Sequence, residues 1–434
     1  MAPTDGTPVY PTVRDSSLTV RDSQASAARR GRSVRVSSNV LFLGLTSLFT
    51  DVSSEMVNAI LPIYLTFELR FSPFQFGLFD GLYQGVTAVL RLAGGLVADR
   101  WRNHKGVAAV GYSLSAGCKL GLLVAANAWF WATGILFLDR LGKGIRTAPR
   151  DALISLSAAR AHLAEAFGVH RALDTVGACL GPVLAFCLLR LAPGAFDAVF
   201  VVSFCAAVVG LGVLLVFVEN RAGAVDGIET SSAVSLRAAL GLLSVPGFRT
   251  LALVGAALSL ATVSDAFVYL TFQRRAHIDP MFFPLLYVGT AVVYLLLSVP
   301  VGRLADRVGR GRVFIAGYVL LLGVYGALLL ATPGAGAVIC GVMLFGAYYA
   351  ATDGVLMALA SEAVPAHLRT SGLALLTTAI AVARLVAAVL FGALWSWRGP
   401  EWTVVFFVVG LAAGVPLAAL GLARRSREPE SEMA

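Results

Sequence analysis

The feature that most constrains this chain is a series of apolar stretches of roughly twenty residues, which begins near Val40 and continues almost to the carboxyl end. A helix of that length rises about 30 Å, which is the thickness of the hydrocarbon core of a bilayer. Such a helix satisfies its own backbone hydrogen bonds, whereas the short alternating segments typical of a membrane barrel do not occur here. The sequence therefore predicts an all-α polytopic membrane protein. The twelve predicted spans are 39–67, 74–97, 106–127, 129–147, 164–189, 196–218, 249–272, 282–304, 313–332, 335–358, 370–396 and 401–423.

Composition agrees with a membrane location, because 58% of the residues are apolar and only 14% are charged. A soluble domain carries about 25% charged residues, so an ordinary soluble enzyme, a nucleic-acid binder and a disordered chain are all excluded. The net charge of +9 comes from basic residues in the tails and in alternate loops. Basic residues collect on the cytoplasmic side of membrane proteins, so we expect both termini in the cytoplasm. The Arg-rich, Lys-poor composition suggests a bacterial cytoplasmic (inner) membrane.

An internal repeat divides the chain into two halves. The sequence at 95–100 (GLVADR) recurs at 302–307 as GRLADR, and the YLTF of 64–67 recurs unchanged at 269–272. Two matches at nearly one offset indicate duplicated six-helix units. The predicted division is a disordered cytoplasmic tail (1–38), an N-terminal bundle (39–218), a cytoplasmic linker (219–248), a C-terminal bundle (249–423) and a second tail (424–434).

The loop sequences of both halves resemble a signature of the major facilitator superfamily. The second copy consists of Gly302, Asp306, Arg307, Gly309 and Arg310. The first copy keeps Gly95, Asp99 and Arg100, but Arg102 replaces the expected glycine. The resemblance implies two pseudo-symmetric six-helix bundles that work by alternating access. It also implies that these loop residues form a cytoplasmic gate that latches the halves together. Simple anchoring of charges at the membrane interface is the alternative role.

Two further motifs carry the same resemblance. Arg140 with Gly144 in span 4 is similar to the embedded arginine motif of the superfamily. A glycine and proline pattern in span 5, made of Gly168, Gly177, Gly181 and Pro182, resembles a motif of antiporters, although its closing glycine pair is replaced by Ala185 and Phe186. Among superfamily members the chain is most similar to drug/H+ antiporters. The two glycines of the small-xxx-small pattern would also serve close helix packing.

Twelve ionisable residues lie inside the predicted spans, which is the strongest bottom-up sign of a translocation path. A charge at the bilayer centre costs about 2.5–3.5 kcal/mol, so these groups must face an aqueous cavity or one another. The twelve are Asp51, Glu55, Asp80, Arg91, Lys119, Asp139, Arg140, Arg171, Asp174, Asp265, Asp353 and Arg384.

An acid pair in span 1 is the predicted proton-coupling site. Asp51 and Glu55 are four residues apart and share a helix face, and their depth near the midplane matches that of Arg140. We therefore predict that Arg140 faces Asp51 or Glu55. Two carboxylates in a medium of low dielectric do not both stay ionised, so one of them is expected to take up a proton near neutral pH. The alternative is a permanent ion-pair network without proton traffic.

The remaining polar positions are assigned to the substrate cavity or to helix pairing. The first helices of the three-helix units line the central cavity in the superfamily, and each carries an acid. The predicted cavity residues are Asn58, Asp139, Asp265, Asp353, Tyr349 and Arg91. We expect Arg171 and Asp174, three residues apart on span 5, to form ion pairs within that helix or with another helix, and Lys119 has no evident partner.

The leading functional prediction is a proton-coupled secondary transporter that exports a small organic compound, a drug or a metabolite. A symporter that imports an organic anion or nutrient, with embedded arginines as ligands, is the alternative. A non-transporting receptor or scaffold is a further alternative, and an enzyme is not expected. No nucleotide-binding loop occurs in the sequence, so we expect that ATP does not drive the protein. The histidines lack the spacing of metal ligands, so we expect no metal. We also expect no cofactor and no nucleic-acid partner. The expected partners are the substrate, protons and the lipid bilayer, and the expected state is a monomer.

Overall fold

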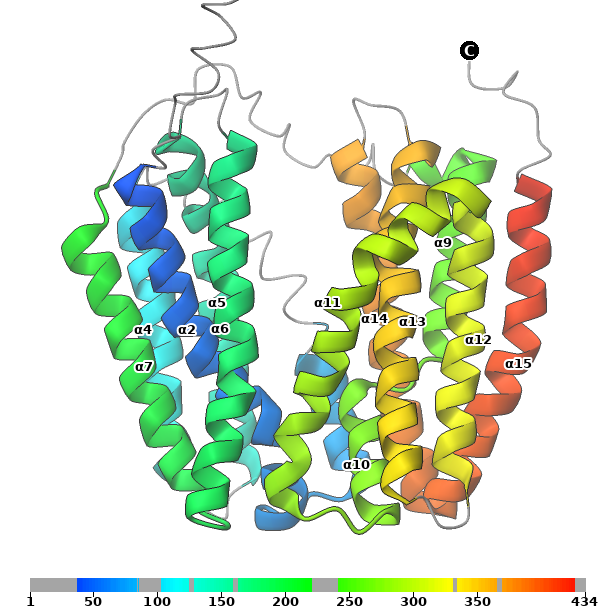
Figure 1. Cartoon of the computed structure of the whole chain (residues 1–434), viewed down its shortest axis with the longest axis horizontal. Coiled ribbons are helices and arrows are strands. Elements are labelled where there is room, and N and C mark those ends of the chain that lie inside the picture. Colours follow the sequence, from blue (N-terminus) through cyan, green and yellow to red (C-terminus); the bar gives the residue numbers. More distant parts are fainter. Residues whose placement is uncertain are drawn as a thin grey trace, which may run out of the picture.

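The computed structural model describes residues 37–83, 85, 103–124, 129–158, 163–220, 241–330, 334–364 and 369–425, and within these ranges it contains helices and no strand (Figure 1). The first half contains α2 (Ser38–Ile63), the π-helical turn η1 (Tyr64–Glu68), a helix over 73–83, α4 (His104–Val124), α5 (Trp129–Leu156), α6 (Leu163–Leu191) and α7 (Phe196–Phe217). The second half contains η3 (Leu242–Ser244), α9 (Pro246–Leu260), α10 (Asp265–Arg275), η4 (Pro280–Phe282), α11 (Phe283–Val308), α12 (Arg310–Leu329), α13 (Ala335–Ala363), α14 (Arg369–Arg398) and α15 (Pro400–Arg425).

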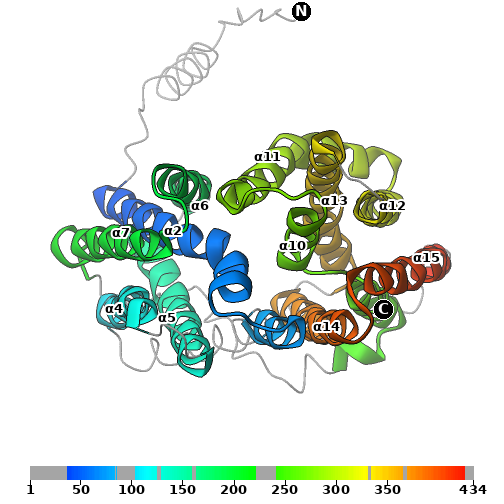
Figure 2. The same cartoon turned by 90° about the horizontal axis from the view of Figure 1, so that it is seen from below.

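The helices form two bundles that approach each other at one end of the molecule. In Figure 1 the bundles diverge toward the end at which α15 finishes and converge at the opposite end. The end-on view in Figure 2 shows the helix over 73–83 beside α14, so the two halves are in contact there. This arrangement confirms the predicted fold class of two six-helix bundles. The predicted domain boundaries stay a prediction, since most of the linker lies outside the described ranges.

Ten helices of the described chain are long and apolar enough to cross a membrane. Two predicted spans are missing from this set for different reasons. The span over 74–97 lies largely outside the described residues, and α5 carries many charges along its length. α5 also continues to Leu156, well beyond the predicted end at residue 147. Span 4 is therefore a long charged helix rather than a purely apolar one.

One predicted span is interrupted, which corrects the expectation of a continuous helix over 249–272. α9 ends at Leu260 and α10 begins at Asp265. The β-branched pair at 262–263 disfavours helix, and Ser264 stands at the N-cap position of α10. Tyr325 of α12 satisfies the exposed backbone: its hydroxyl accepts from the Val263 amide at 2.8 Å and donates to the Ala261 carbonyl at 2.9 Å.

Glycines bring the two halves into backbone contact at the converging end. A Cβ atom on Gly77 would lie 2.5 Å from the Ala388 carbonyl oxygen, and one on Gly81 would lie 2.9 Å from the Leu385 carbonyl oxygen. On α14, a Cβ on Gly392 would meet the Pro73 carbonyl oxygen and the Cα atom of Gly77. Small residues allow such close approach of helices in a membrane. The halves are therefore in direct contact without intervening side chains.

We expect Tyr325→Phe to destabilise the protein, because it removes the hydroxyl that bridges the interruption in span 7. Two buried backbone groups would then lack partners, at a cost of about 1–3 kcal/mol. The midpoint of unfolding in sodium dodecyl sulfate measures this effect. Tyr112→Phe is the matched control, because the buried Tyr112 hydroxyl has no hydrogen-bond partner in the described structure. Equal midpoints for the two variants would contradict the assigned role.

We expect Gly392→Val to open the converging end, because its side chain would overlap the backbone at Pro73 and Gly77. Overpacking costs about 1–3 kcal/mol, so the population of open forms would rise about fivefold or more. The readout is the rate at which maleimide alkylates a buried Leu270→Cys reporter, followed by peptide mass spectrometry. Gly410→Val, where a Cβ meets open space, is the control. An unchanged alkylation rate would show that this contact does not hold the halves together.

Candidate functional site

Charged side chains follow one face of α5 along much of its length. Asp139, Lys143, Arg146 and Arg150 are separated by three or four residues, so they share a face of the helix. Asp139 and Arg146 are buried, while Lys143 and Arg150 are partly exposed. Lys143 is absent from the twelve predicted embedded charges, because the predicted end of span 4 at residue 147 places it close to the membrane interface. The helical spacing of the four charges was the signal that could have identified it.

A buried ion-pair group occupies the contact between α4 and α5. The Asp139 carboxylate accepts from Lys119 Nζ through one oxygen and from Arg140 through the other, the latter at 2.9 Å. All three residues are no more than 6% exposed. Lys119 therefore has a partner that its position in the sequence does not reveal. The ion pair of Arg140 is made with Asp139, and Arg140 also interacts electrostatically with Glu55 of span 1.

A cation–π contact and two hydrogen bonds connect Arg140 to Glu55 of span 1. The Arg140 guanidinium lies 4.2 Å from the centre of the Tyr83 ring. The Tyr83 hydroxyl donates to Asn58 at 2.6 Å, and the Asn58 amide donates to Glu55 at 3.1 Å. Lys143 Nζ lies 4.0 Å from the same Glu55 oxygen. The predicted residues Asn58, Glu55 and Arg140 are thus members of one connected polar network.

The Asp51 carboxyl of α2 lies close enough to the Asp174 carboxyl of α6 for the two groups to interact electrostatically. Lys143 interacts electrostatically with Asp51, and Arg150 lies 3.8 Å from Asp174. Asp174 therefore pairs between helices, which is one of the two expected arrangements, and Arg171 is exposed on the surface of α6. Two carboxyls from different helices thus lie beside two basic groups. No local sequence pattern indicates this arrangement, because the two acids are far apart in the chain.

The glycines of the antiporter-like motif have different surroundings: Gly177 and Gly181 pack against α2, whereas Gly168 does not pack closely against any neighbour. A Cβ on Gly177 would meet the Leu48 carbonyl oxygen, and one on Gly181 would lie 2.8 Å from the Val52 carbonyl oxygen of α2. Pro182 is buried within α6 next to this contact. Gly168 has open space around it. The motif therefore brings α6 close to α2, which is the contact that joins Asp174 to Asp51.

The second half has its own polar cluster at the interruption between α9 and α10. The Tyr349 hydroxyl of α13 donates to the Asp265 carboxylate, and Arg384 of α14 interacts electrostatically with both residues. Asp353 is exposed one turn beyond Tyr349. The predicted cavity residues Asp265 and Tyr349 are therefore in contact. Asp139 differs from them, because its carboxylate is already bound within the first half.

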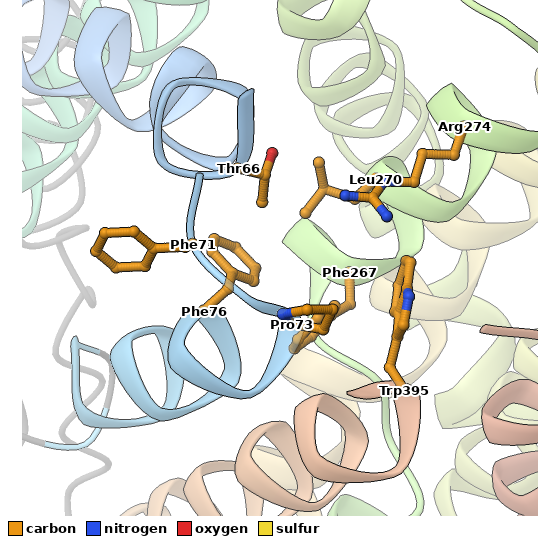
Figure 3. Close-up of a pocket in the computed structure, with 8 residues that line it drawn as sticks. All are labelled: Thr66, Phe71, Pro73, Phe76, Phe267, Leu270, Arg274 and Trp395. Atoms are coloured by element: carbon orange, nitrogen blue, oxygen red, sulfur yellow. The ribbon is translucent and has the colours of Figure 1, made fainter. Parts of the chain in front are cut away.

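Aromatic side chains close the converging end between the halves (Figure 3). Phe76 packs edge-on against Phe267 with ring centres 5.0 Å apart, and Trp395 lies 5.7 Å from Phe267. The Arg274 guanidinium lies 5.3 Å from the Trp395 ring. The Phe74 amide donates to Ser396 across the same junction at 2.9 Å. The access route is thus closed at the end opposite the termini.

The loop motif of the second half forms ion pairs within its own bundle. Arg310 pairs with Asp306 at 2.7 Å and also with Glu362 of α13, and Gly309 has a φ of 110° that favours glycine. Gly302 and Arg307 lie in the last two turns of α11. The first copy, with Gly95, Asp99 and Arg100, lies outside the described residues, and so does Arg91. A latch between the halves stays a prediction.

Comparison with known proteins identifies relatives over nearly the whole chain. The profile of the Major Facilitator Superfamily matches residues 43–292 and 250–433. An uncharacterized MFS-type transporter of Methanocaldococcus jannaschii is 31% identical over 397 residues, covering 88% of this chain and 94% of that protein. An uncharacterized protein of Mycobacterium tuberculosis is 24% identical over 400 residues, covering 89% of this chain and 93% of that protein.

Solved structures share the fold at low sequence identity. The nucleoside transporter NupG superposes with a TM-score of 0.72 at 16% identity, covering 90% of this chain and 99% of that one. A POT family transporter in complex with 5-aminolevulinic acid gives 0.73 at 12% identity, covering 90% and 97%. An inward-facing bacterial homologue of the human lysosomal transporter Spinster gives 0.69 at 15% identity, covering 92% and 100%. The chain belongs to the major facilitator superfamily and is a multi-pass membrane transporter of that family.

Proposed function

We propose that this protein is a proton-coupled secondary transporter that exports a small organic compound across a bacterial inner membrane, as drug/H+ antiporters do. The observation that carries the proposal is that the Asp51 and Asp174 carboxyls lie close together. Two carboxylates repel each other at close range, and one proton shared between them would replace that repulsion by a hydrogen bond. We therefore assign a proton-binding site within the membrane to this pair.

Lys143 can pair with either of two acids, Asp51 or Glu55, depending on whether the carboxyl pair carries its proton. Its ammonium interacts with Asp51 and lies 4.0 Å from Glu55, so it stands between the two acids of span 1. When the carboxyl pair loses its proton, the new negative charge lies next to this cation. Loss of the proton would then draw Lys143 toward Asp51 and away from Glu55. Proton binding and the choice of ion-pair partner are thus linked within one bundle.

The direction of access supports the export cycle. Asp51 and Glu55 are partly exposed, whereas the converging end is closed by aromatic and glycine contacts. If both termini are cytoplasmic, a compound enters from the cytoplasm in this conformation. Binding of that compound would favour release of the proton, and the halves would then rock to open the other end. An export cycle driven by incoming protons follows.

A static ion-pair network is the competing interpretation, and it fits one part of the site. Lys119, Asp139 and Arg140 form a buried group in which the Asp139 carboxylate is bound by two basic side chains. The Asp51 and Asp174 pair differs, because it joins two groups of the same charge and remains partly exposed. We assign a structural role to the first group and the proton to the second.

We expect deletion of the gene to raise the intracellular level of the exported compound and to lower its level in the medium. Metabolite profiling of the deletion strain, with a parallel screen of drug susceptibility, measures this. Wild-type protein and the Asp197→Asn variant, which alters an exposed carboxylate at the start of α7, are expected to restore export. Asp51→Asn is expected to abolish it. A compound depleted from the cells of the deletion strain would instead identify an importer.

We expect infrared difference spectra of the purified protein to contain a carbonyl band of a protonated carboxylic acid that disappears at high pH. The shared proton requires one neutral carboxyl in the pair, so the band is expected to be lost in Asp51→Asn and in Asp174→Asn. Asp197→Asn is the control and is expected to retain it. A wild-type spectrum without such a band, or a band that survives both substitutions, would leave the static network as the better account.

A further inference from the structure

A small pocket opens at the interruption of span 7, on the side of the second half that faces the first. The non-helical backbone between α9 and α10 forms one wall of the pocket. Residues of the helix over 73–83, of α13 and of α14 form the rest. Such breaks in membrane helices expose polar groups that bind substrates or ions. The pocket is lined by Gly81, Thr262, Val263, Ser264, Asp265, Tyr349 and Arg384.

Arg384 contributes an unused hydrogen-bond donor to this pocket. Its Nε atom is buried without a hydrogen-bond partner, and within the described part of the chain the guanidinium forms no ion pair. The side chain as a whole is partly exposed, so it reaches the pocket from α14. A guanidinium in a membrane protein needs an anionic or polar partner. No side chain in the described structure supplies one by direct contact.

Ser264 contributes a second unused donor. It occupies the N-cap position of α10, yet its hydroxyl makes no capping hydrogen bond. The hydroxyl is buried without a partner, like the Arg384 Nε. The amino end of α10 adds a partial positive charge at the same place. An N-cap serine normally bonds to its own helix, so this free hydroxyl is available to a ligand.

The backbone of the interruption and one oxygen of the pocket already have partners. The Asp265 carboxylate accepts from Tyr349, while the Tyr325 hydroxyl accepts from the Val263 amide and donates to the Ala261 carbonyl. The two buried side-chain atoms of the pocket without a partner in the described structure, Arg384 Nε and Ser264 Oγ, can both donate. A group with two acceptor oxygens and a negative charge matches the Arg384 guanidinium and the Ser264 hydroxyl.

We propose that this pocket binds a carboxylate of the transported compound, held between Arg384 and Ser264. The assignment names the substrate class for the transporter proposed above, and it depends on that function only for the direction of transport. Asp265 acts as a positioning residue, since its carboxylate holds Tyr349 and interacts electrostatically with Arg384.

Acetate is the test probe, because it is small enough for the pocket whatever the rest of the substrate is. The purified full-length protein is heated in detergent with increasing acetate at constant ionic strength, and unfolding is followed by tryptophan fluorescence. We expect acetate to raise the unfolding temperature of the wild type, whereas acetamide, which has the same shape without the charge, does not. Replacing the Arg384 contact is expected to weaken acetate binding about tenfold or more.

The variants separate this site from unspecific effects of the salt. Arg384→Gln and Ser264→Ala are expected to reduce the acetate response, Arg384→Lys to retain part of it, and Arg398→Gln to leave it unchanged. Arg398 is an exposed arginine at the end of the same helix. Should one variant fail to fold, the other still reports on the pocket. Equal responses in the wild type, Arg384→Gln and Ser264→Ala, or an equal response to acetamide, would overturn the proposal.

Failure of the two proposals can be told apart. Asp51→Asn is expected to keep the acetate response, because it lies outside the pocket. An acetate response that depends on Arg384, combined with a missing carboxylic acid band, would refute proton coupling alone. The reverse pattern would refute the carboxylate site alone.

Discussion

A charge within hydrocarbon needs a partner, and this constraint determines how the first half is assembled. α5 carries a charged face from Asp139 to Arg150, which no lipid-facing helix could tolerate. Each charge finds its partner on another helix. Lys119 of α4 holds Asp139, Glu55 of α2 lies near Lys143, and Asp174 of α6 lies near Arg150. The Arg146 guanidinium stacks on the ring of Tyr112 of α4. The helices around α5 are therefore fixed by electrostatics as well as by packing. Apolar packing in a membrane supplies little preference of its own, since lipid tails are as apolar as leucine.

The two halves use their polar groups differently, although they derive from one repeated unit. In the first half the network is connected from Lys119 to Lys143, and its members have partners within the protein. In the second half Arg384 and Ser264 keep unused donors beside an interrupted helix. The first half can bind and release a proton through groups of the protein alone. The unused donors of the second half can form their hydrogen bonds only when a ligand is bound. The division of labour between proton and substrate that we propose follows from this difference.

The sequence predicted those features whose physical cause is local in the chain. Span lengths follow from the thickness of the bilayer, so twelve spans and two halves could be read from apolar runs and one repeat. The partners of the embedded charged residues could not be predicted from the sequence. The direction of the Arg140 side chain depends on the rotation of its helix, and the approach of Asp51 to Asp174 depends on how α2 packs against α6. The interruption after Leu260 was hidden within an apolar run. Its trace was the change from β-branched residues to Ser264 and Asp265, a helix-start signal in the middle of a predicted span.

The substrate pocket and the closed end of the molecule are built on the same three helices. On α10, Asp265 lines the pocket and Phe267 closes the end, two residues apart. On the helix over 73–83, Gly81 lines the pocket one turn from Gly77, which touches α14. On α14, Arg384 directly precedes Leu385, whose carbonyl oxygen forms the contact with Gly81. A ligand held between Arg384 and Ser264 would therefore bind one residue away from the backbone contact that joins the halves. Because the pocket and the closure share these helices, we expect occupancy of the pocket to change the stability of the closed end.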